Sequence, residues 1–168
     1  MTGIIVYFST YGSTQKYAES LAERMGWKAL NVKRVTMPDI KSAETVVLAS
    51  NIRIGKMGIR KWAKRHRDML KKKKLHVLAV GGDTADNQKY YRETAMKNLG
   101  FLDLKVEQIS GLGGRKIRSE LNRKDTFLFN SLDKIVKDPA AKEDILKDVD
   151  LVDPGLLEAV VKQLCYKK

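Results

Sequence analysis

The first 25 residues place a hydroxyl-rich turn between an apolar strand and an amphipathic helix. Residues 3–8 are a short apolar run of the kind that is buried on both faces of a parallel sheet. Residues 13–25 then carry apolar side chains at helical spacing. Between them, four hydroxyls surround the single glycine Gly12: Ser9, Thr10, Ser13 and Thr14. A strand, a turn and a helix in this order are typical of the first unit of an α/β sheet.

The turn also indicates a chemistry. The first turn of a helix has unpaired backbone N–H groups and the positive end of the helix dipole. Hydroxyl donors beside them make a phosphate site that needs no cation. The alternative is a helix that is merely capped by Ser13 or Thr14, which accounts for one hydroxyl and leaves the other three without a role.

The remaining chain alternates strands and helices. We predict strands at residues 3–8, 28–33, 45–50, 75–81 and 105–110, and helices at residues 13–25, 58–70, 86–99, 125–136 and 154–166. Strands one, three and four are the most apolar and should be central, whereas strand two alternates and should be an edge. We therefore expect a doubly wound five-stranded parallel sheet of order 2-1-3-4-5, with helices on both faces and a ligand at the carboxyl ends of strands one and three.

Residues 5–18 resemble the phosphate loop of flavodoxins. The pattern of that loop begins with two apolar residues, an aromatic residue and any residue, which here are residues 5–8. It continues with Ser or Thr, any two residues, a small residue and any residue, here residues 9–13, and it ends with Thr-x-x-x-Ala, here residues 14–18. Many flavodoxins have Thr at the position of Tyr11, so one hydroxyl near the phosphate is lost here. The resemblance implies FMN as cofactor, with its phosphate held by Ser9, Thr10, Tyr11, Gly12, Ser13 and Thr14.

If FMN binds, its ring must lie on the loops that follow strands three and four, because these share the same edge of the sheet. The cofactor-binding residues implied there are Asn51, Ile52, Arg53, Ile54, Gly55 and Lys56 after strand three, and Gly81, Gly82 and Asp83 after strand four. Glycines let a backbone approach a flat ring. Arg53 and Lys56 would stabilise negative charge on the reduced flavin and raise its potential.

The loop after strand four is similar to the Gly-Asp pair of the flavodoxin ring loop. Residues 49–55 instead resemble the corresponding loop of flavodoxin-type menaquinone-dependent protoporphyrinogen oxidases, with Asn51 as an apparent one-residue insertion. That resemblance implies oxidation of a porphyrinogen with a quinone as acceptor. An electron-transfer flavodoxin that serves an acidic protein partner is the alternative.

A net charge of +13 is concentrated in one part of the chain. Residues 53–74 contain eleven Lys or Arg and one acid, Asp68, and the cations lie mostly opposite the apolar stripe of the helix predicted at residues 58–70. Such a face predicts an anionic partner, either a membrane surface or an acidic redox protein, unless it is only a solvated surface. Nucleic acid is disfavoured, because aromatic side chains that stack on bases are scarce there and Trp62 belongs to the apolar stripe.

Length and composition limit the remaining possibilities. A chain of 168 residues predicts one domain, here residues 1–168, with a basic helical excursion at about residues 111–142. Within it Arg115, Lys116 or Arg118 would pair with the carboxylates of a porphyrinogen while Phe127 or Phe129 covered its ring; a membrane foot and simple packing are the alternatives. The single cysteine, Cys165, predicts a reducing compartment, and no signal peptide or membrane-spanning run is visible. We expect a cytoplasmic protein, at most peripheral to the inner face of a membrane.

Overall fold

Five parallel strands form the centre of the molecule. The computed structural model describes residues 2–166 and orders the strands β2 (Lys28–Asn31), β1 (Gly3–Phe8), β3 (Thr45–Arg53), β5 (Lys74–Gly81) and β6 (Ile109–Gly113). A two-residue strand, β4 (Lys56–Met57), pairs antiparallel with the end of β3. The predicted doubly wound order is confirmed, and β1, β3 and β5 are central because their apolar runs are buried on both faces.

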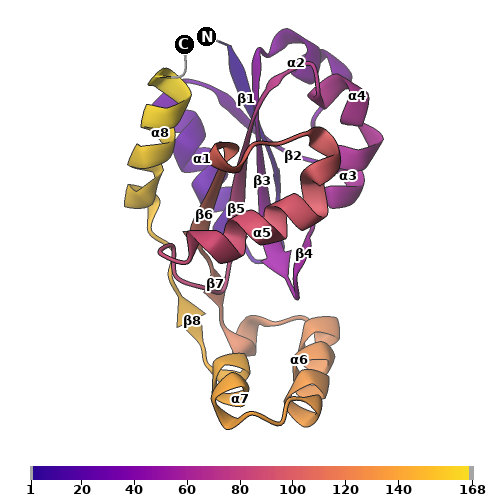
Figure 1. Ribbon diagram of the computed structural model, residues 1–168, viewed down its shortest axis with the longest axis vertical. Coiled ribbons are helices and arrows are strands. Elements are labelled where there is room, and N and C mark those ends of the chain that lie inside the picture. Colours follow the sequence, from indigo (N-terminus) through magenta and orange to yellow (C-terminus); the bar gives the residue numbers. More distant parts are fainter. Residues whose placement is uncertain (1, 167–168) are drawn as a thin grey trace.

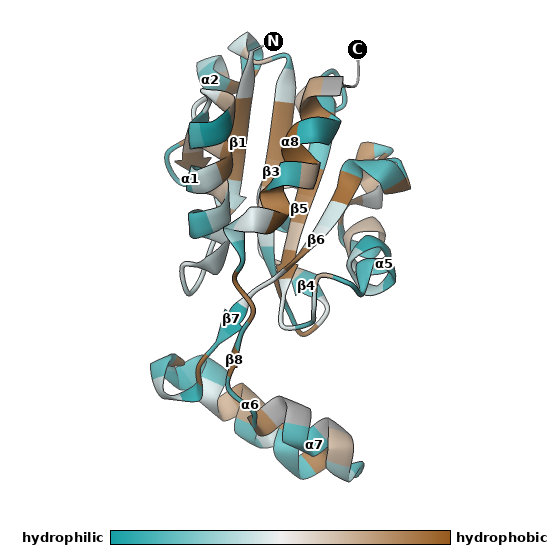
Figure 2. Cartoon of the chain, turned by 90° about the vertical axis from the view of Figure 1, so that its left-hand side faces the viewer, coloured by the Kyte–Doolittle hydropathy of each residue, from teal (hydrophilic) through white to brown (hydrophobic). Residues whose placement is uncertain are grey.

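Helices cover both faces of this sheet (Figure 1). On one face α1 (Ser13–Met25) and α8 (Leu157–Tyr166) pack against the inward residues of β1, β3 and β5. On the other face lie α2 (Met37–Ser42), α3 (Arg60–Arg65), α4 (Arg67–Leu70) and α5 (Gln88–Leu99). Coloured by hydropathy, the strands are the apolar centre and the outer helix faces are polar (Figure 2). The sheet therefore holds the loops at its carboxyl edge in fixed positions.

The clearest differences between the predicted elements and the structure concern three segments. Residues 105–108 were predicted to begin a strand but form a tight 3₁₀ turn, so β6 begins only at Ile109. The Gln108 side chain stabilises this turn: its oxygen accepts from Lys105 N, and its nitrogen donates to Leu75 O at 2.8 Å. The helix predicted at residues 58–70 is broken at His66, whose ring nitrogen Nδ1 lies 2.8 Å from the Trp62 carbonyl oxygen. Helix α2 was not predicted, although Thr36 and Asp39 form a capping box at its start.

The predicted excursion at residues 111–142 is shifted toward the C-terminus. Residues 111–113 complete β6, and the chain then leaves the sheet through β7 (Arg115–Lys116) and returns through β8 (Val149–Asp150), which pair antiparallel. Between them are α6 (Arg123–Ile135) and α7 (Pro139–Leu146). We call residues 115–150 the lobe; it projects beyond the carboxyl edge of the sheet (Figures 1 and 2). None of the helices between residues 2 and 166 combines the length and apolarity that a membrane span needs.

Candidate functional site

A cavity of about 290 Å³ opens at the carboxyl ends of β1, β3 and β5. Its walls are formed by the turn between β1 and α1, the β3–β4 hairpin, the end of β5 with the turn after it, Tyr90 of α5, and the lobe. Eleven of the residues predicted to bind a cofactor line it: Ser9, Thr10, Tyr11, Ser13, Thr14, Asn51, Ile52, Arg53, Ile54, Gly81 and Gly82. The predicted loops thus meet at one place, as the order of the strands requires.

The turn of residues 9–14, which we call the phosphate loop, leaves the start of α1 open. Gly12 is the N-cap residue, with a φ of 92° that favours glycine, and no described side chain caps the helix. Lys16 N donates to Gly12 O at 2.9 Å, and the first turn has no acidic residue. Capping by Ser13 or Thr14, the alternative interpretation of this turn, is therefore wrong. The first N–H groups and the positive dipole end are available to an anion.

The loop hydroxyls keep their own hydrogens for a ligand. Ser9 Oγ accepts from Gly12 N at 3.1 Å, and Thr10 Oγ1 accepts from Asn51 Nδ2 at 2.9 Å. Ser13 Oγ accepts from Arg115 N at 3.1 Å. A hydroxyl that accepts a hydrogen bond still has a hydrogen to donate. One bond within the loop and two from other segments thus hold it in place, while its hydroxyl hydrogens remain free to bind an anion.

Thr14 is the most informative of these residues. Its side chain is 1% exposed and lines the cavity, yet Thr14 Oγ1 has no hydrogen-bond partner among the described residues. Leaving a buried polar group unpaired costs about 1–3 kcal/mol. A phosphate at the N-terminus of α1 would accept from this hydroxyl and remove that cost, so the residues present fit a phosphate-bearing ligand.

The loop predicted after strand three is a hairpin. β3 continues to Arg53, and Ile54 and Gly55 form a two-residue turn with positive φ at both positions, 48° and 67°. Gly55 and Lys56 do not line the cavity, because the hairpin directs them outward. Gly55 therefore serves the turn, and its carbonyl accepts from Asn98 Nδ2 at 2.9 Å. Asn51, the apparent insertion, ties this hairpin to the phosphate loop.

The turn after β5 presents bare backbone to the cavity. Gly81 and Gly82 line it, and a Cβ added at Gly82 would meet no atom within 4 Å. Asp83 lies outside the cavity wall: its carboxylate accepts from Thr84 N and Asn87 Nδ2, and its carbonyl accepts from the Tyr91 hydroxyl at 2.5 Å. Asp83 therefore anchors the turn to α5, and Gly82 keeps an open space that a flat ligand can fill.

The lobe supplies a carboxylate that sequence reasoning missed. Asp125 lines the cavity and is completely buried, with Arg53 Nη1 2.5 Å from its Oδ1. The Tyr11 hydroxyl donates to Asp125 Oδ2 and accepts from Asn122 N at 3.2 Å. Burial and the neighbouring carboxylate raise the pKa of the Tyr11 phenol. The spacing of Asn122 and Asp125 marks the start of a helix, but no sequence signal directs Asp125 toward Arg53.

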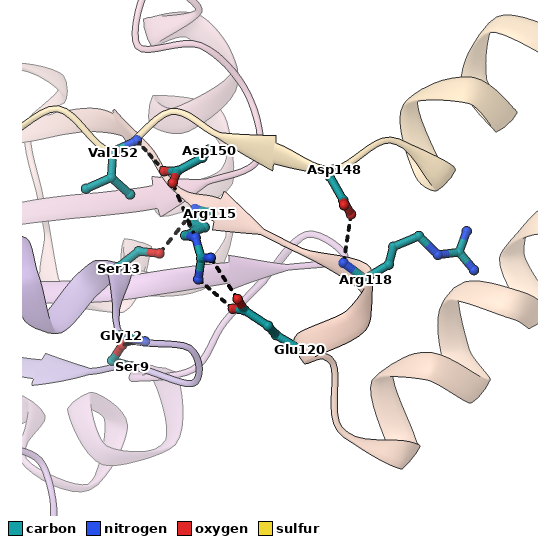
Figure 3. A network of polar contacts seen from close by, with 9 residues as sticks. All are labelled: Ser9, Gly12, Ser13, Arg115, Arg118, Glu120, Asp148, Asp150 and Val152. Atoms are coloured by element: carbon teal, nitrogen blue, oxygen red, sulfur yellow. Dashed lines mark hydrogen bonds and ion pairs between the residues drawn. The ribbon is translucent and has the colours of Figure 1, made fainter.

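Arg115 joins the lobe to the phosphate loop (Figure 3). Its guanidinium holds Glu120 through contacts of 2.5 and 2.7 Å and lies 3.3 Å from Asp150 Oδ2. The hydrogen bonds and charge of Glu120, with Asp150 beside it, raise the pKa of Arg115. Because its charge is compensated within the lobe, Arg115 is not the unpaired cation that a substrate carboxylate would need.

The other residues expected to meet a substrate are distributed unevenly. Lys116 and Phe129 line the cavity, and Lys116 Nζ lies 5.5 Å from the centre of the Phe129 ring. Arg118 Nη2 donates to Asn130 Oδ1 at 3.1 Å, and Phe127 is 75% exposed on the outside of the lobe. Tyr90 and Leu121, which the sequence did not indicate, complete the apolar part of the wall.

Two solved structures of other proteins share the fold of this chain at low sequence identity. A flavoprotein candidate from Bacteroides eggerthii shares 15% identity and a TM-score of 0.50, covering 78% of this chain and 96% of that one. Rubredoxin oxygen:oxidoreductase from Desulfovibrio gigas also shares 15% identity and a TM-score of 0.50, covering 87% of this chain and 37% of that one. A flavoprotein in complex with FMN from Lactobacillus acidophilus has 12% identity, a TM-score of 0.48, and coverages of 67% and 90%.

Comparison with curated proteins returned no match. The family model of the flavodoxin domain, in contrast, matches residues 4–143, which include the phosphate loop, the hairpin, the turn after β5 and most of the lobe. Since this match spans most of the chain and the sheet has the expected order, the chain belongs to the flavodoxin domain family.

Proposed function

We propose that this protein binds FMN in the cavity at the carboxyl edge of the sheet and works as a redox protein. The observation that carries the proposal is Thr14 Oγ1, a buried hydroxyl at the open N-terminus of α1 that has no hydrogen-bond partner among residues 2–166 as the structure describes them. When bound, FMN supplies an isoalloxazine ring that accepts and returns electrons. The resemblance of residues 5–18 to the flavodoxin phosphate loop identifies FMN among phosphate-bearing ligands.

The residues divide into two tasks. Thr14, the other loop hydroxyls and the first N–H groups of α1 would hold the phosphate without a cation. Farther along the cavity Ile52, Tyr90 and Phe129 offer apolar surface, and Gly82 offers open space, for the flat ring. The lobe contributes Leu121, Asp125 and Phe129 to the wall of this part of the cavity.

We further propose a porphyrinogen as the electron donor and a quinone as the acceptor. In each cycle two electrons and two protons would leave the porphyrinogen and reach the quinone, which becomes a quinol. Lys116 and Phe129 support this proposal, because a cation beside an aromatic ring suits a flat substrate that bears carboxylates. The lobe in which both residues lie is an addition to the five-stranded core.

Titration of the purified apoprotein with FMN, riboflavin and FAD tests the cofactor. We expect a yellow complex, and tighter binding of FMN than of the other two ligands, because the loop is shaped for one terminal phosphate. Equal binding of FMN and riboflavin would contradict the proposal.

The role of the lobe can be tested by removing it cleanly. Lys116 and Val149 lie directly opposite each other in the β7–β8 pair. Replacing residues 117–148 by Asn-Gly would therefore close a two-residue hairpin. We expect this variant to keep its preference for FMN over riboflavin and to lose quinone-coupled oxidation of a porphyrinogen. If the intact protein lacks that oxidation but accepts electrons from a flavodoxin reductase, it is an electron carrier.

A carrier would need a docking surface, and one observation favours an anionic partner. Helix α3 and the residues after it expose a run of cations, namely Arg60, Lys61, Lys64, Arg65 and Lys72, beside Arg67, which pairs with Asp68 at 3.1 Å. Nearby cations already have structural partners: Lys71 pairs with Asp103 at 2.5 Å, and Lys73 Nζ donates to the carbonyls of Lys41 and Ala43 at the end of α2. The remaining basic face would bind an acidic membrane surface or an acidic redox protein.

A further inference from the structure

Three elements that are distant in the sequence meet at one carboxylate in the cavity wall. Asp125 comes from the first turn of α6, Tyr11 from the phosphate loop, and Arg53 from the end of β3. The Asp125 side chain is 0% exposed, whereas the Arg53 side chain is 45% exposed. Arg53 Nη1 and Asp125 Oδ1 form an ion pair of 2.5 Å whose angles do not make a hydrogen bond, and the Tyr11 hydroxyl donates to the other carboxylate oxygen.

Helix capping alone does not account for this arrangement. An acid in the first turn of a helix is favourable while it faces solvent, where it complements the dipole. Asp125 is instead buried, and a buried carboxylate carries a penalty of several kcal/mol unless a partner compensates it. Asn122 already caps α6 by accepting from Asp125 N at 2.9 Å. The Asp125 carboxylate is therefore directed at the cavity and at Arg53.

Arg53 is one of the two cations that were expected from the sequence to raise the potential of a bound flavin; the other, Lys56, does not line the cavity. It lines the same cavity as Thr14, on the wall formed by the β3–β4 hairpin. An unpaired guanidinium there would favour electrons added to a neighbouring ring. With a carboxylate held against it, the pair has no net charge, so most of that effect is removed.

Resting on the FMN binding proposed above, we propose that Asp125 is a positioning residue that lowers the reduction potential of the bound flavin by holding Arg53 in an ion pair. The lobe thereby sets the redox property of the site as well as covering it. Tyr11 has the second part in this arrangement, because its hydroxyl keeps the carboxylate in place. A Thr at that position is too short to reach across to the lobe.

The test is Asp125→Asn in the FMN-loaded protein, equilibrated with a reference dye to obtain the midpoint potential. Asparagine keeps an oxygen that accepts from Tyr11 but removes the charge. Loss of one charge near the ring should favour the reduced over the oxidised flavin about tenfold, since unit charges still interact across several ångströms of protein. For a two-electron couple, tenfold corresponds to a rise of about 30 mV.

Matched variants separate this role from a loss of structure. Asp148→Asn removes an acid of the same lobe that accepts from Arg118 N at 2.8 Å and lies outside the cavity wall; it should leave the potential unchanged. Arg53→Gln tests the pair from the exposed side and should lower the potential, even if Asp125→Asn fails to fold. The double variant Arg53→Gln/Asp125→Asn should return close to the parent value.

The outcomes are distinct. A raised potential in Asp125→Asn together with a lowered one in Arg53→Gln supports the proposal. If Asp125→Asn weakens oxidised and reduced FMN equally, the potential does not move, Asp125 has only a structural role, and the proposal is overturned. An unchanged or raised potential in Arg53→Gln overturns it as well. If the parent protein binds no FMN, the proposed function itself fails, which is a separate result.

Discussion

Replacing Thr14 by valine should weaken the binding of FMN and stabilise the apoprotein at the same time. Valine has nearly the shape of threonine but lacks the hydroxyl, and the two have similar helix propensities. Thr14 Oγ1 is buried and has no partner in the part of the chain that the structure describes, so its removal relieves a penalty of about 1–3 kcal/mol in the free energy of unfolding. In the complex the same hydroxyl would donate to a charged phosphate, a bond worth about 1.5–3 kcal/mol.

The two effects have opposite signs and separate readouts. FMN affinity should fall about 10- to 100-fold, since 1.4 kcal/mol is a factor of ten. Riboflavin, which lacks the phosphate, should bind Thr14→Val as well as it binds the parent. Fluorescence quenching gives both affinities, and urea denaturation of the apoprotein should show a stability gain of about 1 kcal/mol. Thr14→Ser, which keeps the hydroxyl, should preserve the preference for FMN.

The chain contains a matched control for this experiment. Thr45 Oγ1, at the first residue of β3 and about 20 Å along the strand from Asn51, is also buried and likewise unpartnered within the described residues. Thr45→Val should stabilise the apoprotein and leave FMN affinity unchanged. The reasoning is refuted if Thr14→Val weakens FMN and riboflavin by the same factor, or if Thr45→Val weakens FMN as much as Thr14→Val does.

Three other predictions follow from the same structure. Gly82→Ala should change apoprotein stability by only a few tenths of a kcal/mol but weaken FMN binding in a fluorescence titration, because the added methyl enters open cavity space. Burial raises the pKa of the Tyr91 phenol above the ordinary 10.0, so above about pH 10 the folded state keeps a proton that the unfolded chain loses. The free energy of unfolding, measured in urea, should therefore fall as the pH rises above about 10, and it should fall less steeply in Tyr91→Phe. The fraction of protein that sediments with acidic vesicles should decline steeply with added salt, and it should vanish when Lys61, Lys64 and Arg65 are replaced by Glu, while the flavin spectrum stays unchanged. Vesicle binding that persists under both changes would contradict an electrostatic docking surface.

The pattern of apolar residues along the chain was sufficient to predict the central part of the fold. β1 and α1 have the predicted bounds, because an apolar run and a helical stripe on either side of Gly12 leave few alternatives. The strand order followed from which runs are apolar enough to be buried on both faces. The bounds of the edge strand β6 were harder to predict, because its start depends on whether residues 105–108 pair with β5 or form a turn. The Gln108 side chain decides this through a hydrogen bond to a carbonyl that is distant in the sequence.

The phosphate loop shows how far sequence reaches into the site. Four hydroxyls beside one glycine predicted a set of donors at a helix N-terminus, and the structure brings those residues to one cavity. Their separate tasks were not predictable, because the partners of Thr10 and Ser13 come from β3 and the lobe. Thr14 is distinguished only by the absence of such a partner among the described residues.

The sequence by itself determined the strand–turn–helix unit, the parallel sheet and the loops that meet at its carboxyl edge, because periodicity and turn chemistry are local properties. Only the tertiary structure decided the electrostatics of the site. Arg53 is a free cation in the sequence and half of an ion pair in the fold, since the lobe returns Asp125 to the end of β3. Which charges compensate one another depends on distances across the fold, and no pattern along the chain contains them.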